Sequence, residues 1–170
     1  MIICANEKVI IRHFTEADIT TEYLSWLNDQ DLMKFSNQRF KSHDRGTALR
    51  YLRTFEHSQN AFFAITSLEG VLVGTMTAYK NENHQTIDMG ILIGKPFTGS
   101  GLGKSAWLCL FRELENDPTI RKITAGCAHA NLAMIKLIEG VGMQLEGRRK
   151  HQELYDGELI DILLYGKLIR

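Results

Sequence analysis

Hydrophobic positions change period several times along the chain, from the two-residue repeat of strands to the three-to-four-residue repeat of helices. The most regular helical stretch is 102–115, where Leu102, Ala106, Leu110 and Leu114 fall on one face. The same patterns predict helical regions at about 15–27, 43–57 and 131–139, and strands at 8–13, 61–67, 71–80, 85–94, 120–127, 143–154 and 158–169.

Start and turn signals support these boundaries. Thr15 and Asp18 have the spacing of a capping box at a helix start. Glu69-Gly70 predicts a tight turn, and Asp156-Gly157 predicts a hairpin between the last two strands. The order β-α-α-β-β-β-α-β-α-β-β indicates an α/β (α+β) fold with a mixed central sheet of about seven strands. With no linker or repeat, we expect residues 1–170 to form a single domain.

Composition narrows the class of protein. The chain has 170 residues with 44% hydrophobic and 24% charged residues, as in ordinary globular domains. Its 20 basic and 20 acidic residues cancel, so no net field attracts nucleic acid or a membrane. Three cysteines without a CxxC pattern imply neither a disulfide framework nor a zinc site. We therefore expect a cytoplasmic protein without a metal, a nucleic-acid partner or a membrane partner, as a monomer or homodimer.

A glycine-rich loop between a strand and the 102–115 helix is the sharpest local feature. It contains Gly99, Ser100, Gly101, Leu102, Gly103 and Lys104. Closely spaced glycines let the backbone approach a ligand, and a helix N-terminus favours an anion. The loop therefore predicts a phosphate or pyrophosphate site, with a ligand-free turn as the simpler interpretation.

Two known phosphate motifs fit this loop incompletely. A dinucleotide-binding GxGxxG is absent because the spacing is GxGxG. A Walker A loop is a near match, since Gly103-Lys104-Ser105 fits while Thr98 replaces the first glycine. Pro96 and Phe97 separate the loop from its strand, which is unusual for a P-loop. A P-loop-like nucleotide-phosphate enzyme remains an alternative.

Three segments in the same order resemble the GNAT acetyltransferases, in the branch of the ribosomal-protein N-terminal acetyltransferases. They are IDMGILIGKPFTGSGLGKSA, HANLAMIKLIEGVGM and LEGRRKHQELYDGELIDILLYGKL, and the resemblance covers almost the whole chain. It implies the GNAT fold and transfer of an acetyl group from acetyl-CoA directly to a primary amine. The family loop has Gln or Arg where this chain has Thr98.

The resemblance also assigns the cofactor contacts. Residues 99–104 would hold the CoA pyrophosphate. Backbone N–H groups of Ile91 and Leu92 would polarise the acetyl carbonyl, as an oxyanion hole does. The sequence gives separate support, because Gly90 and Gly94 interrupt this strand, and such glycines often mark a bulge, a close ligand approach or tight packing.

Asp88 and Asn131 are the candidate catalytic residues. Asp88 matches the position of a glutamate base in many relatives and shares a strand face with Gly90; a solvated carboxylate is the simpler interpretation. Glu56 and His129 are reserve bases. Asn131 is expected first to cap a helix and, by resemblance, to lie near the CoA arm. The tyrosine that protonates the leaving thiolate in many relatives is Ile138 here.

The resemblance also implies that the segment between the first two helices and the closing hairpin shape the acceptor site. Here Phe35, Asn37, Gln38 and Arg39 combine an aromatic ring, two amides and a cation, which suits a small anionic amine such as an amino-sugar nucleotide. A fragment of the segment also looks like members of surface-polysaccharide pathways. Transfer to a protein or peptide N-terminus is the second hypothesis. A catalytically inactive CoA-binding module is a third.

Overall fold

Eight strands form one mixed sheet in the computed structural model, which describes residues 2–170. The strand order is β1-β2-β3-β4-β5-β6-β8-β7. The strands are β1 Ile2–Ala5, β2 Val9–His13, β3 Ala61–Ser67, β4 Leu72–Asn81, β5 Thr86–Ile93, β6 Lys122–Ala128, β7 Gln144–Tyr155 and β8 Glu158–Leu168. The helices are α1 Thr21–Leu27, α2 Arg45–Arg53, α3 Leu102–Asn116 and α4 Leu132–Gly140, with short 3₁₀ turns at Glu16–Asp18, Asn37–Phe40 and Lys95–Phe97.

The predicted element order is confirmed, with two differences. The sheet has eight strands because β1, only four residues long, precedes the first predicted strand and pairs with β2. The expected helix over 15–27 is divided into a 3₁₀ turn with a Thr15–Asp18 capping box and α1, which Thr20 caps through the backbone N–H of Tyr23. At the predicted hairpin, Asp156 and Gly157 have φ of 50° and 88°, as a type I′ turn requires.

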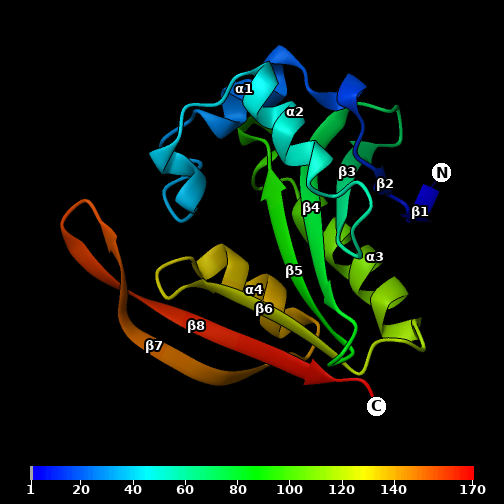
Figure 1. Ribbon diagram of the computed structural model, residues 1–170, viewed down its shortest axis with the longest axis vertical. Helices are drawn as coiled ribbons and strands as arrows, with labels where there is room; N and C mark the ends of the chain where they lie inside the picture. Colours follow the sequence, from blue (N-terminus) through cyan, green and yellow to red (C-terminus); the bar gives the residue numbers. More distant parts are fainter. Residues whose placement is uncertain (1) are drawn as a thin grey trace.

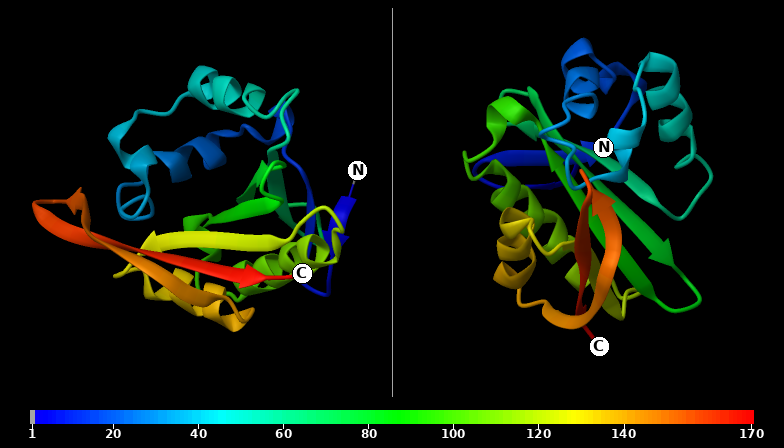
Figure 2. Two further views of the ribbon diagram at one scale, coloured as in Figure 1. Left: turned by 60° about the horizontal axis from the view of Figure 1, so that its bottom comes forward. Right: turned by 90° about the vertical axis from the view of Figure 1, so that its left-hand side faces the viewer.

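Helices cover both faces of the sheet (Figures 1 and 2). On one face, α3 and α4 pack on the sheet in a core that includes Trp107, Leu110 and Ile138. On the other, α1 and α2 pack over β3 and the ends of β4 and β5, around Tyr23 and Phe62. The longest helix, α3, has 15 residues, and no helix within residues 2–170 is long and apolar enough to cross a bilayer.

The sheet opens in its middle, between β5 and β6. These parallel strands pair only at Thr86–Lys122, Ile87–Ile123 and Asp88–Thr124, after which they diverge (Figure 1). By contrast, β4 and β5 stay paired without a register shift from Gly74–Ile93 to Asn81–Thr86. The C-terminal half of β5 therefore borders a wedge-shaped opening.

Two contacts fix the α1 region beside this opening. The Asp18 carboxylate is buried and accepts bonds from both terminal nitrogens of Arg12, at 2.7 and 2.6 Å, and from the Thr15 N–H at 2.8 Å. Trp26 of α1 packs directly on Gly94, where an added Cβ would lie 2.4 Å from the indole ring. Gly94 therefore serves close packing.

The Arg12–Asp18 pair predicts an acid-sensitive part of the stability. Burial alone would raise the pKa of Asp18, but its bonds from Arg12 and Thr15 outweigh burial and lower the pKa. Asp18→Asn should reduce the free energy of unfolding by about 1–3 kcal/mol near neutral pH. Because the folded pKa is depressed, this stabilisation is complete above the unfolded pKa of about 4 and is lost as the pH falls through the folded value.

Urea unfolding of both proteins between pH 3 and 7 measures this difference. Glu16→Gln is the matched control, because the Glu16–Arg45 pair is exposed and should contribute less than about 0.5 kcal/mol. A difference between Asp18→Asn and wild type that grows on acidification would contradict the interpretation.

Candidate active site

The glycine loop forms a cradle of backbone N–H groups at the start of α3. Gly99 and Gly101 adopt left-handed conformations, with φ of 76° and 81°, that only glycine adopts readily. No side chain caps α3, so the N–H groups of Gly103 and Lys104 in its first turn lack a hydrogen-bond partner within residues 2–170. Gly103 has a packing role as well, because an added Cβ would lie 3.1 Å from Ile93. This arrangement suits a phosphate or pyrophosphate.

The edge of β5 supplies a second set of free N–H groups. The N–H of Gly94 donates to the Val73 carbonyl of β4 at 2.9 Å. Because strand N–H groups alternate in direction, those of Leu92 and Gly90 also point toward β4, whereas that of Ile91 points toward the opening. Of the two residues expected to polarise a carbonyl, only Ile91 directs its backbone N–H into the opening. Leu92 instead forms part of the cavity wall.

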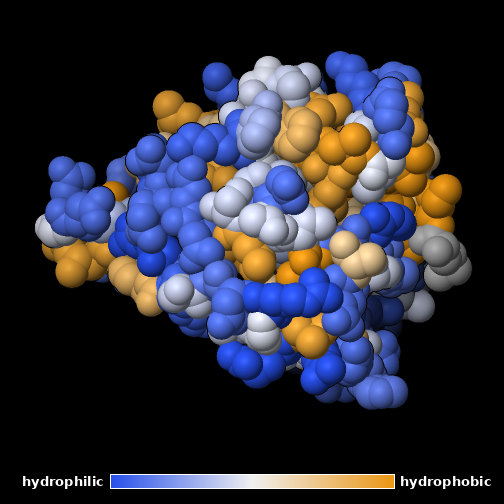
Figure 3. Space-filling view, turned by 90° about the horizontal axis from the view of Figure 1, so that it is seen from above, coloured by the Kyte–Doolittle hydropathy of each residue, from blue (hydrophilic) through white to orange (hydrophobic). Residues whose placement is uncertain are grey.

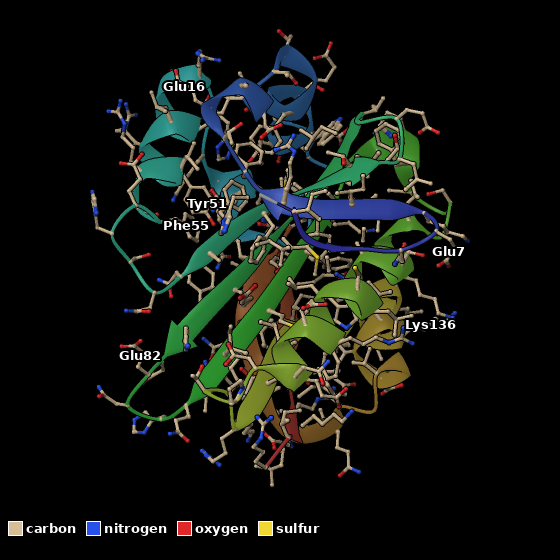
Figure 4. The ribbon with its side chains drawn as sticks, turned by 90° about the vertical axis from the view of Figure 1, so that its right-hand side faces the viewer. Glu7, Glu16, Tyr51, Phe55, Glu82 and Lys136 are labelled. Atoms are coloured by element: carbon tan, nitrogen blue, oxygen red, sulfur yellow. The ribbon has the colours of Figure 1, made fainter. Side chains whose placement is uncertain are left out.

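A cavity of about 800 Å³ lies between the α1–α2 layer and the sheet, beside this part of β5. Side chains of α1, α2, β3, β4 and the segment 28–44 line it together with Gly90, Ile91 and Leu92. Tyr51 of α2, labelled in Figure 4 beside Phe55 of the turn that follows, packs edge-on against Phe62 at one wall, with ring centroids 5.4 Å apart. The volume of the cavity suits a small-molecule ligand.

The charge of the cavity wall is one-sided. Lys41 and Arg50 line it, both are exposed, and neither makes an ion pair in the described chain. No aspartate or glutamate is among its lining residues, although the chain as a whole has no net charge. Viewed from above, polar residues gather toward the hairpin tip, and hydrophobic ones are more frequent on the opposite side (Figure 3). Lys41 and Arg50 form an exposed, positively charged part of the lining, which we call the mouth of the cavity, and it favours an anion.

Asp88 lies at the point where β5 and β6 separate, in a second depression that also contains Glu146 and Glu153. Water reaches its carboxylate, yet protein surrounds most of it, and this burial raises the pKa of Asp88. The hydroxyl of Thr124 donates to its Oδ2 at 2.8 Å and acts in the opposite direction. Phe35 lines both the cavity and this depression, so an acidic and a basic region adjoin on one face of the sheet.

Asn131 caps its helix as expected and also borders the cavity. Its side chain caps α4 by accepting the Met134 N–H at 3.2 Å, and the residue also lines the cavity. Ile138, where relatives have a tyrosine, is fully buried in the core and has no access to the opening.

The reserve bases lie outside both recesses. Glu56 is exposed in the turn after α2. His129 is tied to β8. Its ring Nδ1 accepts the backbone N–H of Asp161 at 3.2 Å, and its backbone N–H donates to the Asp161 carbonyl at 2.9 Å. Neither residue borders the cavity or the depression.

The segment expected to hold the acceptor is only partly turned to the cavity. Phe35 and Gln38 line it, while Asn37 is exposed away from it. Arg39 does not line it and is engaged elsewhere. Its terminal nitrogens donate to the carbonyls of Lys34, at 2.9 Å, and Leu154, at 2.7 Å.

The guanidinium of Arg39 also stacks 3.8 Å from the ring centroid of Tyr155. Arg39 thus joins the segment 34–41 to the tip of the β7–β8 hairpin, which lie side by side in Figures 1 and 2. These contacts give Arg39 a structural role outside the cavity lining, although three of its five N–H groups, including the buried Nε–H, have no partner within residues 2–170.

Several cavity residues carry no sequence signal. Lys41 and Arg50 look like solvated charges in a linear sequence, and Tyr23, Thr75 and Thr77 look like ordinary helix and strand positions. Only the packing of α1 and α2 over β4 and β5 brings them to one recess.

A family model described as "Acetyltransferase (GNAT) domain" matches residues 8–144. No curated protein matches the sequence significantly.

Solved structures with the same fold cover nearly the whole chain. A GNAT-family acetyltransferase from Bacillus anthracis matches with a TM-score of 0.82 and 20% identity, over 99% of both chains. RimL, a ribosomal L7/L12 α-N-protein acetyltransferase solved with coenzyme A, matches with a TM-score of 0.87 and 15% identity, over 99% of this chain and 98% of its own. MccE, a microcin C7 self-immunity acetyltransferase solved with acetyl-CoA and AMP, matches with a TM-score of 0.82 and 16% identity, over 96% of this chain and 93% of its own.

The contacts of Arg39 predict a structural effect of its substitution. In Arg39→Lys one ammonium cannot keep both carbonyl bonds and the stacking on Tyr155. We expect a loss of about 1–2 kcal/mol in unfolding free energy and faster amide exchange in peptides covering 34–41 and 152–158. Lys150→Gln, which removes an exposed hairpin charge without such contacts, is the control. Unchanged exchange at the hairpin tip in Arg39→Lys would contradict the role.

Proposed function

The chain belongs to the GNAT acetyltransferases and is an acetyl-CoA-dependent N-acetyltransferase, and from this premise we propose that its acceptor is a small primary amine carrying an anionic group. An amino-sugar nucleotide is the favoured class. The observation that carries the proposal is the cavity mouth, where Lys41 and Arg50 are exposed, make no ion pair within residues 2–170 and share the lining with no carboxylate. The nearest carboxylate acting on Arg50, that of Asp44, lies outside the cavity lining. Family membership also decides against a P-loop enzyme. We place the reaction in the cytoplasm.

The residues present fit acetyl-CoA, which supplies an activated acetyl thioester. The free N–H groups at Gly103 and Lys104 would bind its pyrophosphate, with Gly99, Ser100, Gly101 and Leu102 completing the cradle. The pantetheine arm would follow the open edge of β5 toward Asn131. There the N–H of Ile91 would donate to the acetyl carbonyl oxygen and stabilise the charge that develops on it.

Asp88 is the proposed general base. An amine is mostly protonated near neutral pH, so a carboxylate must take its proton, directly or through water, before nitrogen attacks the carbonyl carbon. The C–N bond then forms and the C–S bond breaks. The nitrogen gives up its second proton to water, and the thiolate takes a proton from water. The raised pKa of Asp88 suits a base, and the carboxylates near it favour the cationic end of the acceptor.

The basic and acidic recesses together fit an acceptor with an amine at one end and an anion at the other. Lys41 and Arg50 line the cavity, whereas no residue of the α3 cradle that would hold the CoA phosphates does, so the two cations are available to a second anion. MccE, which shares the fold, is solved with AMP as well as acetyl-CoA. An uncapped peptide N-terminus needs no anion at this position, and it is the second candidate.

The role of Asp88 is tested by pH–rate profiles. A base must be deprotonated, so kcat/KM should fall as the pH drops through the Asp88 pKa, which burial places above that of an ordinary aspartate. Asp88→Asn should lower kcat about 100-fold or more, abolish this acid limb and leave the KM for acetyl-CoA nearly unchanged. Asp88→Glu should keep the limb at reduced kcat. An Asp88→Asn enzyme with the wild-type profile removes Asp88 from the mechanism.

The acceptor class is tested with a panel of UDP-linked amino sugars, amino-sugar phosphates, polyamines and short peptides. Arg50→Gln and Lys41→Gln should each lower kcat/KM for phosphorylated acceptors about 10-fold, with little effect on the KM for acetyl-CoA. Arg53→Gln, which removes an exposed cation from the next turn of α2, is the matched control. Preference for peptides or polyamines, or equal activity of all these variants, would exclude the proposed acceptor class.

A further inference from the structure

Tyr23 differs from every other tyrosine in the chain. Four of the five hydroxyls have protein partners within residues 2–170: those of Tyr51 and Tyr79 bond each other at 2.9 Å, Tyr155 donates to Glu153, and Tyr165 donates to Glu139. The Tyr23 hydroxyl has none, although the residue is only 3% exposed and lines the cavity. The fully buried side-chain atoms without partners in the described chain belong to Arg39, Ser67 and Trp107, so the Tyr23 hydroxyl is open to the cavity, where water or a ligand can bond to it.

The Tyr23 ring is held firmly in place. It packs against Phe14, with ring centroids 5.0 Å apart, and edge-on against Trp26 at 6.2 Å. Trp26 in turn lies on Gly94 at the end of β5. Burial raises the pKa of Tyr23 far above its ordinary value, so the hydroxyl keeps its proton and can donate at physiological pH.

Two threonine hydroxyls of β4 also line this cavity and have no protein partner in the described chain. Thr75, 5% exposed, and Thr77 stand two positions apart on β4, and therefore on one face. They are paired across the ladder with Leu92 and Gly90, which places them beside the strand where transfer would occur. An added Cβ on Gly90 would lie 2.7 Å from the Thr77 Oγ1, so the glycine leaves room for that hydroxyl.

We propose that the hydroxyls of Tyr23, Thr75 and Thr77 form a hydrogen-bonding floor that selects an acceptor whose amine is carried by a hydroxylated ring, an amino sugar. The inference rests on the proposed function and deepens it: the cations at the mouth take the anionic group, and the floor takes the sugar. The three hydroxyls of the floor each need a hydrogen-bond partner, and a ring with several hydroxyls offers enough donors and acceptors to supply them. A hydroxyl-free acceptor would leave the same groups unpaired, which is an effective basis for discrimination.

Matched acceptors test this floor. A UDP-linked amino sugar is compared with UDP-hexanolamine, which keeps the nucleotide, the diphosphate and a primary amine but replaces the sugar by a hydroxyl-free chain. An amino-sugar phosphate and 6-aminohexyl phosphate form a second pair. The wild-type enzyme should prefer the sugar in at least one pair by about 10-fold or more in kcat/KM.

Tyr23→Phe removes only the hydroxyl and should lower kcat/KM for the sugar about 3- to 10-fold while leaving the aminoalkyl partner unchanged. Thr75→Val should act in the same direction. Thr66→Val, which removes a buried β3 hydroxyl bonded to the Ile10 carbonyl and lying in neither recess, is the matched control and should change neither. Melting temperature and the KM for acetyl-CoA should stay at wild-type values in Tyr23→Phe, which separates specificity from folding.

The possible failures can be told apart. If wild type uses aminoalkyl phosphates as well as the sugars, the anionic acceptor class stands and the floor is wrong. If Tyr23→Phe lowers kcat equally for all acceptors, its hydroxyl serves the leaving thiolate and the floor is again wrong. If no phosphorylated amine is acetylated while peptides or polyamines are, the proposed function fails and this inference fails with it.

Discussion

The separation of β5 from β6 is the constraint on which the site depends. A parallel pair that stayed in register would use the Ile91 N–H in the ladder and would fill the space beside it with side chains. After only three residue pairs the strands diverge, and both remain supported on their outer sides, β5 by β4 and β6 by β8. A polar backbone edge is thereby kept open inside a folded core, at a place where a ligand can complete its hydrogen bonds.

The two helical layers use this opening differently. On the α3 face, the cradle at Gly99–Lys104 is built from backbone, so it imposes little on side-chain choice. On the α1–α2 face, the wall consists of side chains from several separate segments, including Tyr23, Arg50 and Thr75. The proposed acetyl-CoA site therefore depends mainly on the fold, whereas the proposed acceptor site depends on individual residues, which can change without loss of the fold.

This division explains what the sequence could predict. Strands β2 to β8 and helices α2 to α4 follow from periodicity and turn residues, because local pattern and tertiary packing agree there. The loop at 99–104 has a local signature and lies where expected. β1 was missed because four residues carry too little pattern, and Arg39 was assigned to the cavity because composition does not reveal the direction of a side chain. Lys41, Arg50 and Tyr23 come together only through long-range packing, for which a single sequence has no signal.

The Arg39 contact has a consequence for how acceptor preference can change over evolution or by engineering. Because Arg39 bonds to the Leu154 carbonyl and stacks on Tyr155, the segment 34–41 and the hairpin tip form one unit, although over 100 residues separate Arg39 from Leu154 in the chain. A graft from a relative that replaced only one of them would leave a guanidinium or an aromatic ring without its counterpart. We therefore expect a graft of this region between relatives to keep its packing only when both segments are transferred together, as a single discontinuous module.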